Sequence, residues 1–210
     1  MMIKRFLESL LKEKSQGPYP SFSILHLIKS LELIVKEGSV GRGRLSKELE
    51  IGVGVTRTLI SRLKNAKLVI VSKSGCSLTQ KGEKIWNELQ SIILQKFEIE
   101  KSELTLGTYD FAVLIKGCGH KIKNGIKQRD VAIIAGANGA TTLFFRKKHL
   151  ILPRISKNVA LDYPVAFSNI TRLFELEEND VVVIGSANTL KRAEYGALAA
   201  AWSLIDDVSN

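Results

Sequence analysis

Cysteine is scarce in this chain of 210 residues. Only Cys76 and Cys118 occur, far apart and without the CxxC or Cys/His spacing of a zinc site. The pattern speaks against a disulfide framework and against structural zinc, so we assign no metal ligand. The hydrophobic fraction of 45% and the charged fraction of 25% are instead typical of a globular chain that buries an apolar core.

Long apolar runs are also missing. No run approaches the roughly 20 apolar residues that a membrane-spanning helix needs. The N-terminal segment MMIKRFLESLLKEK is interrupted by Glu8 and Glu13, and no small-residue cleavage site follows it. We therefore expect a cytoplasmic protein that has no signal peptide and no membrane partner.

Known cofactor motifs do not occur. Residues 136–141 (GANGAT) have neither the GxGxxG spacing of a dinucleotide fold nor the lysine of a P-loop. No internal repeat or low-complexity segment is present either. We therefore assign no cofactor and no catalytic residue.

Positive charge is what the chain has in excess. The formal net charge is +10, and residues 42–84 carry ten Lys or Arg against three Glu, a balance of +7. Binding to a polyanion releases counterions and needs cations gathered on one surface. A solvated basic surface explains the total charge but not its concentration in this segment, which favours nucleic acid as the partner.

The segment 44–84 has the order of elements of a winged helix-turn-helix. Leu45 and Leu49 predict a short helix, and Gly52 and Gly54 predict a turn in which positive φ is allowed. A second helix follows, and its inward face is apolar: Val55, Leu59 and Leu63. Its opposite face carries the side chains that reach phosphates and base edges in a major groove: Thr56, Arg57, Ser61, Arg62, Lys64 and Asn65.

A predicted wing completes this segment. Residues 68–72 and 76–79 predict two short strands joined by a basic turn, and Thr79 predicts the N-cap of the helix that follows. Just ahead of the segment, Arg42 and Arg44 either touch phosphate or solvate a turn.

Residues 55–70 and the run SLTQKGEKIWNEL resemble the winged-helix DNA-binding domains of bacterial and archaeal transcriptional regulators. In that family the second helix enters the major groove of double-stranded DNA, and the wing touches the minor groove or the backbone. The resemblance implies base contacts from Thr56, Arg57, Ser61 and Arg62 and wing contacts from Lys73 and Ser74. We include Arg44 and Lys64 in the same DNA-binding site. The alternative is a winged helix used only for protein contacts.

Three segments outside the winged helix bear on assembly. Residues 2–14 predict an amphipathic helix that covers either its own winged helix or a second subunit. Residues 15–21 (SQGPYPS) predict a linker. A helix over residues 80 to about 101 has more apolar surface than a small winged helix covers, which favours dimerisation or packing on the next domain. Because operators are two-fold symmetric, we expect a homodimer.

Residues 104–210 predict a second domain in which strands alternate with helices. Strands are expected at residues 109–115, 141–145, 149–152 and 181–184, and helices at 126–135 and 190–204, the last capped by Asn188 or Thr189. This alternation predicts an α/β domain with a mixed sheet. The fold class is therefore α+β or α/β, with a winged helix in residues 1–103 and an effector-binding or assembly domain in residues 104–210.

Two turns of the second domain are candidate ligand sites. Backbone N–H groups of residues 125–142, with Arg129 nearby, suit an anionic small molecule, although Arg129 and Asp130 equally fit a local ion pair. The turn at residues 185–188 is expected at the end of a strand and the start of a helix, where α/β sheets bind ligands. The candidate residues are Gln128, Arg129, Asp130, Asn138, Thr141, Thr142, Ser186 and Asn188.

Residues 110–204 resemble the C-terminal domain of a family of uncharacterised archaeal proteins that carry an N-terminal winged helix. The resemblance rests on GIKQRDVAIIAGANGATTLFF and VVVIGSANTLKRAEYGALAAAWSL. It implies the two-domain layout and an archaeal source but brings no activity with it.

The main functional hypothesis is a dimeric DNA-binding transcriptional regulator whose second domain senses a small-molecule effector or mediates assembly. The second hypothesis is an enzyme fused to a winged helix. Its active site would lie near residues 125–142, or would use Cys118 as nucleophile with His120 as base and Asp130 orienting it. Neighbouring positions seldom give that geometry. The third hypothesis is a pure assembly module.

Overall fold

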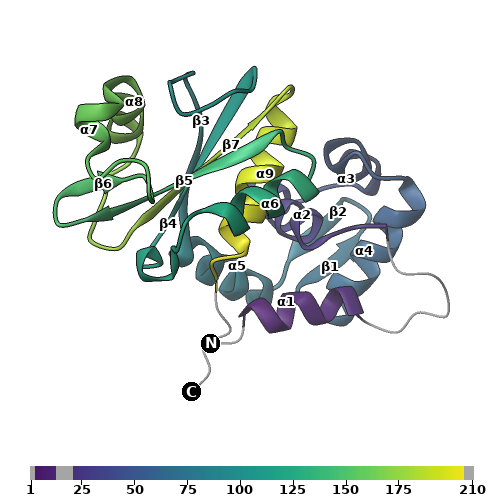
Figure 1. Ribbon diagram of the computed structural model, residues 1–210. Coiled ribbons are helices and arrows are strands. Elements are labelled where there is room, and N and C mark those ends of the chain that lie inside the picture. Colours follow the sequence, from purple (N-terminus) through teal and green to yellow (C-terminus); the bar gives the residue numbers. More distant parts are fainter. Residues whose placement is uncertain (1–2, 13–20, 206–210) are drawn as a thin grey trace. The chain divides into compact units, whose positions relative to one another are not determined.

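A computed structural model describes residues 3–12 and 21–205, and Figure 1 shows their helices and strands. Contacts divide the chain into two compact units, the first ending at Leu89 and the second beginning at Gln90. Each unit is described by itself. The linker predicted at residues 15–21 lies, except for Ser21, outside the described residues.

The first unit contains the predicted helix pair. Helix α2 (Ile24–Glu37) is followed by α3 (Arg42–Leu49) and α4 (Val53–Asn65), the two helices of the helix-turn-helix. Leu45 of α3 and Leu63 of α4 are completely buried, as the apolar spacing predicts. The helix-turn-helix is therefore confirmed as local structure.

The turn between α3 and α4 differs from its prediction. The residue with positive φ is Glu50, at 53°, and it ends α3 in the left-handed conformation. Gly52 has a φ of −58° and is the N-cap of α4, while Gly54 lies inside that helix. A charged residue thus occupies the position for which glycine is the usual choice.

The predicted wing is present. Strand β1 (Val69–Ser72) pairs in antiparallel fashion with β2 (Gly75–Leu78), and the basic tip at residues 73 and 74 joins them. Val40 adds a bridge to the outer side of β2, because its N–H and C=O exchange hydrogen bonds of 2.9 Å with Cys76. The bridge fixes the wing to the turn that precedes α3.

Helix α1 (Ile3–Lys12) belongs to the first unit and packs on α2. Its apolar residues Ile3, Leu7 and Leu10 are buried there. The sequence predicts that this helix packs either on its own winged helix or on a second subunit. The structure shows it packed on its own winged helix.

The helix predicted over residues 80–101 is wrong in its second half. Helix α5 (Gln80–Ile92) begins after Thr79, whose Oγ1 accepts the Gly82 N–H at 3.0 Å, so the predicted N-cap is confirmed. The chain then forms strand β3 (Ile93–Ile99), because backbone pairing with the next strand outweighs the helical spacing of the apolar residues. The division after Leu89 accordingly precedes the boundary expected at residue 103.

The second unit is built on one five-stranded sheet. Its strands lie in the order β3-β4-β7-β5-β6. The remaining four strands are β4 (Tyr109–Ile115), β5 (Gly139–Arg146), β6 (His149–Ile151) and β7 (Val181–Ala187). The predicted hairpin of β5 and β6 is confirmed.

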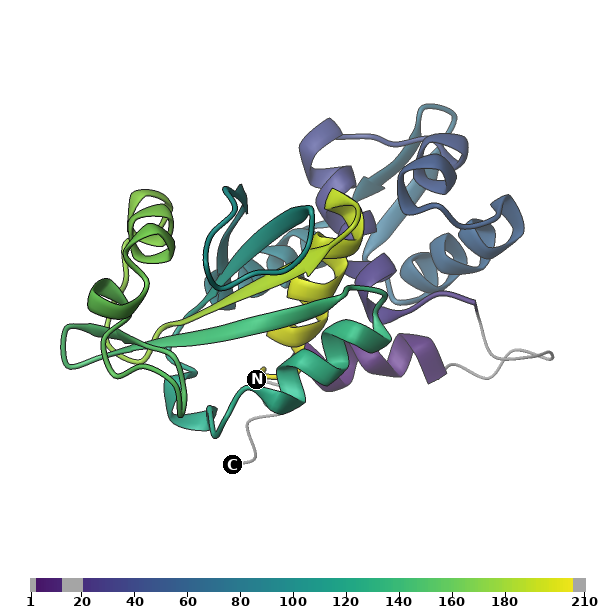
Figure 2. The same cartoon turned by 45° about the horizontal axis from the view of Figure 1, so that its top comes forward.

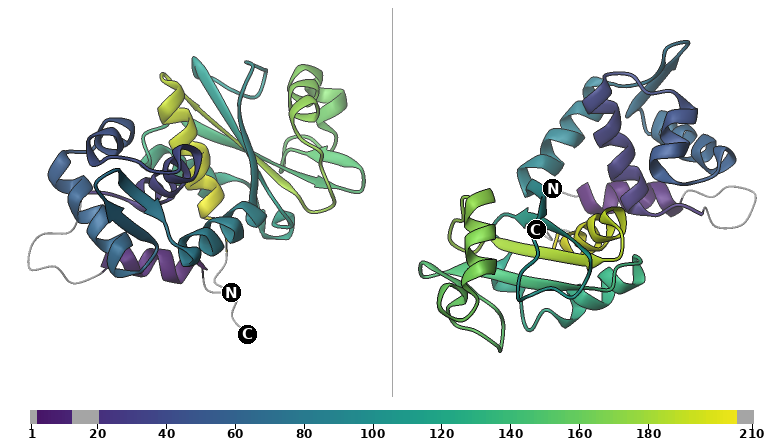
Figure 3. Two further views of the ribbon diagram at one scale, coloured as in Figure 1. Left: turned by 180° about the vertical axis from the view of Figure 1, so that it is seen from behind. Right: turned by 90° about the horizontal axis from the view of Figure 1, so that it is seen from above.

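Every strand pair of this sheet is antiparallel, so the expectation of a mixed sheet is wrong, whereas the combination of helices and sheet is confirmed. Helix α6 (Ile126–Ile134) connects β4 to β5, as in a parallel unit. Strand β7 lies between these two strands and runs against both (Figure 3). The sequence shows the connection, but not that a later strand enters between its ends.

Helices cover both faces of the sheet (Figure 2). Helix α6 and helix α9 (Leu190–Trp202) pack on one face, with α9 against β4 and β7. The predicted cap of α9 is confirmed, because Thr189 Oγ1 accepts the Arg192 N–H at 3.3 Å. On the other side lie α7 (Val159–Asp162) and α8 (Pro164–Leu173). None of the described helices is long and apolar enough to cross a bilayer.

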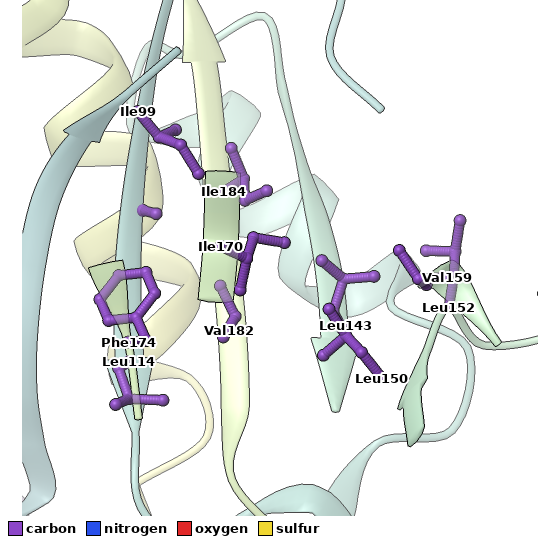
Figure 4. Packing of buried hydrophobic residues seen from close by; sticks show 11 residues of the cluster. Ile99, Leu114, Leu143, Leu150, Leu152, Val159, Ile170, Phe174, Val182 and Ile184 are labelled. Atoms are coloured by element: carbon purple, nitrogen blue, oxygen red, sulfur yellow. The ribbon is translucent and has the colours of Figure 1, made fainter. Parts of the chain in front are cut away.

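A hydrophobic core of the second unit lies between the sheet and α8 (Figure 4). Ile170 and Phe174 reach the sheet from α8 and the residue after it, and Val182 and Ile184 of β7 form the centre of the cluster. Leu143 of β5 extends the cluster toward β6. Side chains of alternate strand positions thus build one buried layer, as expected for a sheet covered on this face.

Candidate nucleic-acid interface

A groove of about 440 Å³ lies between α4 and the wing of the first unit. Residues from α4, from the wing and from the start of α3 line it. We call it the basic groove, because its charged lining residues are Arg42, Arg57, Lys64 and Lys73, and neither Asp nor Glu lines it. The four cations thus share one concave surface, the distribution that a polyanion needs.

Five of the eight predicted DNA-binding residues line the basic groove. Arg57, Ser61 and Lys64 are exposed on α4 at spacings of four and three residues, which place them on one side of the helix. Lys73 and Ser74 are exposed at the wing tip and face the groove from the other side. The structure therefore brings helix and wing residues together, as the winged-helix resemblance implies.

Arg44 is exposed but does not line the basic groove. Its guanidinium lies 2.9 Å from the Glu48 carboxylate and 3.4 Å from that of Glu37. Two acidic partners offset the charge of Arg44. We therefore expect Arg44 to bind a DNA phosphate less strongly than the cations of the basic groove do.

Thr56 and Arg62 are corrections to the predicted site. Both are buried: Thr56 is 0% exposed and donates its hydroxyl to the Gly52 carbonyl at 3.1 Å, while Arg62 is 4% exposed. Arg62 Nη1 donates to the carbonyls of Leu10 and Leu11, at 2.7 and 2.8 Å, near the end of α1. Neither side chain is available to a base edge.

The physical reason is that the inward face of α4 is wider than its own apolar pattern indicates. Thr56 lies one turn before Leu59 and Ile60, on the same side of the helix. Arg62 points to α1, which a reading of α4 alone does not include. There the guanidinium also lies 5.4 Å from the centre of the Phe22 ring.

Arg42 is the groove residue that the predicted site omits. It is exposed, opens α3 directly after the N-cap Gly41, and lines the basic groove with that glycine. The sequence feature that could have identified Arg42 is its position at the start of a helix, because the N-terminus of a helix favours phosphate. Sequence reasoning did not separate it from Arg44, which stands two residues further on.

The predicted ligand residues of the second unit are spread over several places. Three of them, Arg129, Thr141 and Thr142, line a common groove, whose volume is about 460 Å³. We call it the edge groove because it lies along β5, beyond the end of β6. Gln128 is buried and donates to Ser203 at 3.3 Å, and Arg129 pairs with Asp130, which bears out the local ion pair.

The predicted anion site at residues 185–188 is not a turn at the start of a helix. Gly185 and Ser186 lie inside β7, and Ser186 Oγ accepts the Gly107 N–H at 2.6 Å. A Cβ atom at Gly185 would collide with the backbone of Ala193 and Ala197. The glycine therefore allows α9 to pack closely on the sheet. Asn188 accepts a hydrogen bond of 3.0 Å from the other remaining candidate, Asn138, at the surface.

Cys118 and His120 differ in their surroundings. Cys118 is buried, and its Sγ lies 3.8 Å from Lys121 Nζ, whereas His120 is exposed. A nucleophile and its base must be within hydrogen-bond reach of each other. The arrangement gives no support to a Cys–His pair. Among the described residues, no group of three or more His, Cys, Asp and Glu has the arrangement of a metal site.

Comparison with known proteins identifies the first unit more closely than the second. Residues 21–93 match the family described as CggR N-terminal DNA binding domain. The chain carries an N-terminal DNA-binding domain. Residues 106–204 match a domain of unknown function, DUF4443. No curated protein matches the sequence.

The fold is also found among solved structures. The hypothetical protein PH0730 from Pyrococcus horikoshii OT3 is 24% identical to this chain, with a TM-score of 0.68. The alignment covers 88% of this chain and 93% of that one. At this identity the likeness concerns the fold alone. The parts of the chain that match known families are therefore the DNA-binding domain and the domain of unknown function.

Proposed function

We propose that this protein is an archaeal, cytoplasmic transcriptional regulator that binds double-stranded DNA through the basic groove. The observation that carries the proposal is the concentration of Arg42, Arg57, Lys64 and Lys73 around one concave surface without an acidic residue in its lining. Helix α4 contacts base edges through Arg57 and phosphates through Lys64, and the wing tip contacts the DNA backbone. The match to a DNA-binding domain over residues 21–93 supports the same partner.

The proposed site is smaller than the sequence indicates. Arg57 and Ser61 are the exposed polar residues nearest the middle of α4, so they read base edges, while Lys64 and Lys73 neutralise phosphates. Arg62 acts indirectly, by holding α1 against the helix pair. This division of roles separates residues that affect DNA affinity from one that affects stability.

We further propose that the regulator is a homodimer whose second unit binds an effector or mediates assembly. Two-fold operators favour dimers, and the second unit exposes two consecutive large apolar residues of α6, Ile133 at 47% and Ile134 at 85%. Sedimentation of the full chain tests the dimer. A monomer at all concentrations, with unchanged DNA affinity, would remove this part of the proposal.

The test of DNA binding is a salt titration of affinity for a fluorescent duplex. Each phosphate neutralised contributes roughly −0.9 to the slope of log K against log salt, so Arg42, Lys64 and Lys73 on phosphates, with Arg57 on a base edge, predict about −2.7 per protomer. Lys64→Ala should make the slope shallower by about 1 for each bound protomer. Lys84→Ala is the matched control, since Lys84 is an exposed helical lysine outside the basic groove.

Arg57→Ala tests base reading. We expect a loss of about 1–3 kcal/mol on the preferred sequence and a smaller loss on random duplex. Equal effects of Lys64→Ala and Lys84→Ala on the slope would contradict the basic groove as the DNA-binding surface.

A further inference from the structure

The edge groove of the second unit exists because β5 is longer than its outer neighbour. Strand β6 pairs only with residues 144–146 of β5, although β5 begins at Gly139. On its inner side β5 pairs with β7 along the whole stretch from Gly139 to Phe144. The first half of β5 therefore has an open outer edge, and Ala140, Thr141 and Thr142 form the floor of the groove there.

The open edge presents backbone hydrogen-bonding groups. Phe145 donates its N–H to the Asp180 carbonyl at 2.8 Å and accepts from Asn179, so its backbone faces β7. Backbone direction alternates along a strand. Ala140 and Thr142 therefore turn their N–H and C=O groups outward, where no described strand pairs with them.

Two charged residues of opposite sign line the edge groove. Arg129 lies on α6 and pairs with Asp130 at 2.8 Å, but both side chains are 53% exposed, so the pair is weak and its guanidinium can exchange partners. Glu103 is held in place because its carboxylate accepts the N–H groups of Val165 and Ala166, at 3.3 and 3.1 Å, at the start of α8.

The edge groove offers one negative and one positive side chain to a ligand. A hydrogen bond from its own backbone N–H, followed by those from Ala166 and Val165, lowers the pKa of Glu103, so its carboxylate is ionised at neutral pH. Arg129 stands on the first turns of α6, where Asn124 Oδ1 accepts the Ile126 N–H at 3.1 Å and the first turn has no acidic residue. The positive end of that helix dipole adds to the positive charge of Arg129.

Much of the remaining lining is apolar. Leu106 is 96% exposed and Ile155 67% exposed, unusual for large aliphatic side chains that flank one groove. Leu152, Pro153 and Tyr163 continue this wall. The volume of about 460 Å³ falls in the range of small-molecule sites.

On the groove floor, the Thr142 hydroxyl is buried without a hydrogen-bond partner among the described residues. This hydroxyl adds to the backbone N–H and C=O groups of Ala140 and Thr142, which also lack a described strand as partner at this edge.

We propose that the edge groove binds a free amino acid with an apolar side chain. Its carboxylate pairs with Arg129 near the start of α6, its ammonium group pairs with Glu103, and its side chain lies on Leu106 and Ile155. A simple anion does not fit as well, because Glu103 repels it, and a simple amine is repelled by Arg129. The inference deepens the proposed function by naming the effector class, and it rests on that function only for the effector role, not for binding.

The test is calorimetric titration of the full chain, without DNA, with L-leucine, L-isoleucine and L-phenylalanine. Two analogues of leucine separate its charges: 4-methylpentanoate lacks the ammonium group, and 3-methylbutylamine lacks the carboxylate. We expect saturable binding of at least one amino acid, and binding of each analogue weaker by about tenfold or more than that of leucine.

Variants assign each charge to its partner. Arg129→Gln should abolish the preference for leucine over 3-methylbutylamine, and Glu103→Gln the preference over 4-methylpentanoate, because each removes one partner. Arg192→Gln is the matched control: Arg192 is an exposed arginine on α9 that does not line the groove, so its replacement should leave affinity unchanged.

Three results would overturn the proposal. They are no saturable binding of any amino acid up to about 10 mM, equal binding of leucine and 4-methylpentanoate, and amino-acid binding that both groove variants leave unchanged. Because the titration contains no DNA, its failure does not affect the basic groove as a DNA-binding surface. Conversely, loss of DNA binding in the salt titration leaves the amino-acid site standing.

Discussion

Replacement of Arg62 separates a structural role from a role in DNA contact. Its guanidinium makes two hydrogen bonds to carbonyls near the end of α1 and is 4% exposed. Hydrogen bonds from a charged donor contribute about 1.5–3 kcal/mol each. Two effects lower the net loss: water can bond to the guanidinium once α1 detaches in the wild type, and the alanine variant no longer has the desolvation cost of a buried charge. We therefore expect Arg62→Ala to destabilise the docking of α1 by about 2–4 kcal/mol.

The assay is amide hydrogen exchange followed by mass spectrometry on peptides from α1 (Ile3–Lys12). A loss of 2–4 kcal/mol corresponds to exchange faster by roughly 30- to 700-fold, since each 1.4 kcal/mol is about tenfold. Peptides from α9, in the other unit, should be unchanged. The salt slope of DNA binding should also stay the same, because a buried guanidinium neutralises no phosphate.

Lys64→Ala is the matched control on the same helix. Lys64 is exposed and lines the basic groove, so its loss should leave α1 exchange within about 0.5 kcal/mol of wild type while it makes the salt slope shallower. The opposite pattern, with unchanged α1 exchange and a reduced slope for Arg62→Ala, would refute the buried role of Arg62.

Three further predictions concern the second unit, each measured by urea unfolding of the full chain. Gly185→Ala should destabilise by about 1–3 kcal/mol, because the added Cβ collides with the backbone of α9, and a neutral result would contradict the close packing. Thr142→Val should stabilise by about 1 kcal/mol, since a buried hydroxyl without a partner is replaced by a methyl group of similar size; a loss of stability would show that the hydroxyl is bonded. The lowered pKa of Glu103 gives stability that is present above its usual pKa of 4.5 and is lost as pH falls through the lowered value, so Glu103→Gln should flatten this acid dependence.

The winged helix was accessible from sequence because its signals are local. The apolar spacing of Leu59 and Leu63, the β-branched run of the first wing strand and the cap at Thr79 each specify an element within a few residues. The exposed cations of the site followed from the same helical period. These are features that the chain determines without reference to distant segments.

The burial of Arg62 could not be predicted in this way. Its partners at Leu10 and Leu11 stand about fifty residues earlier, and the pairing depends on where α1 packs. An arginine on the flank of an apolar stripe has the same local pattern whether it faces DNA or another helix. Tertiary contact decides between the two.

The second unit shows the same limit at the level of topology. Helical spacing extended the helix of residues 80–92 into a segment that pairs with β4 as strand β3. The insertion of β7 between β4 and β5 made the sheet antiparallel and placed Gly185 under α9 instead of in a ligand-binding turn. Long-range pairing governs both outcomes, and sequence periodicity contains no information on it.

Hydrogen exchange of the full chain with and without a pool of duplex DNA at low salt tests the DNA-binding surface most directly. We predict protection of amides in α4 around Arg57 and Lys64 and in the wing around Lys73, with none in peptides of the sheet. Protection confined to other segments, or unchanged exchange in α4 and the wing under conditions where the duplex is bound, would contradict the assignment of the basic groove.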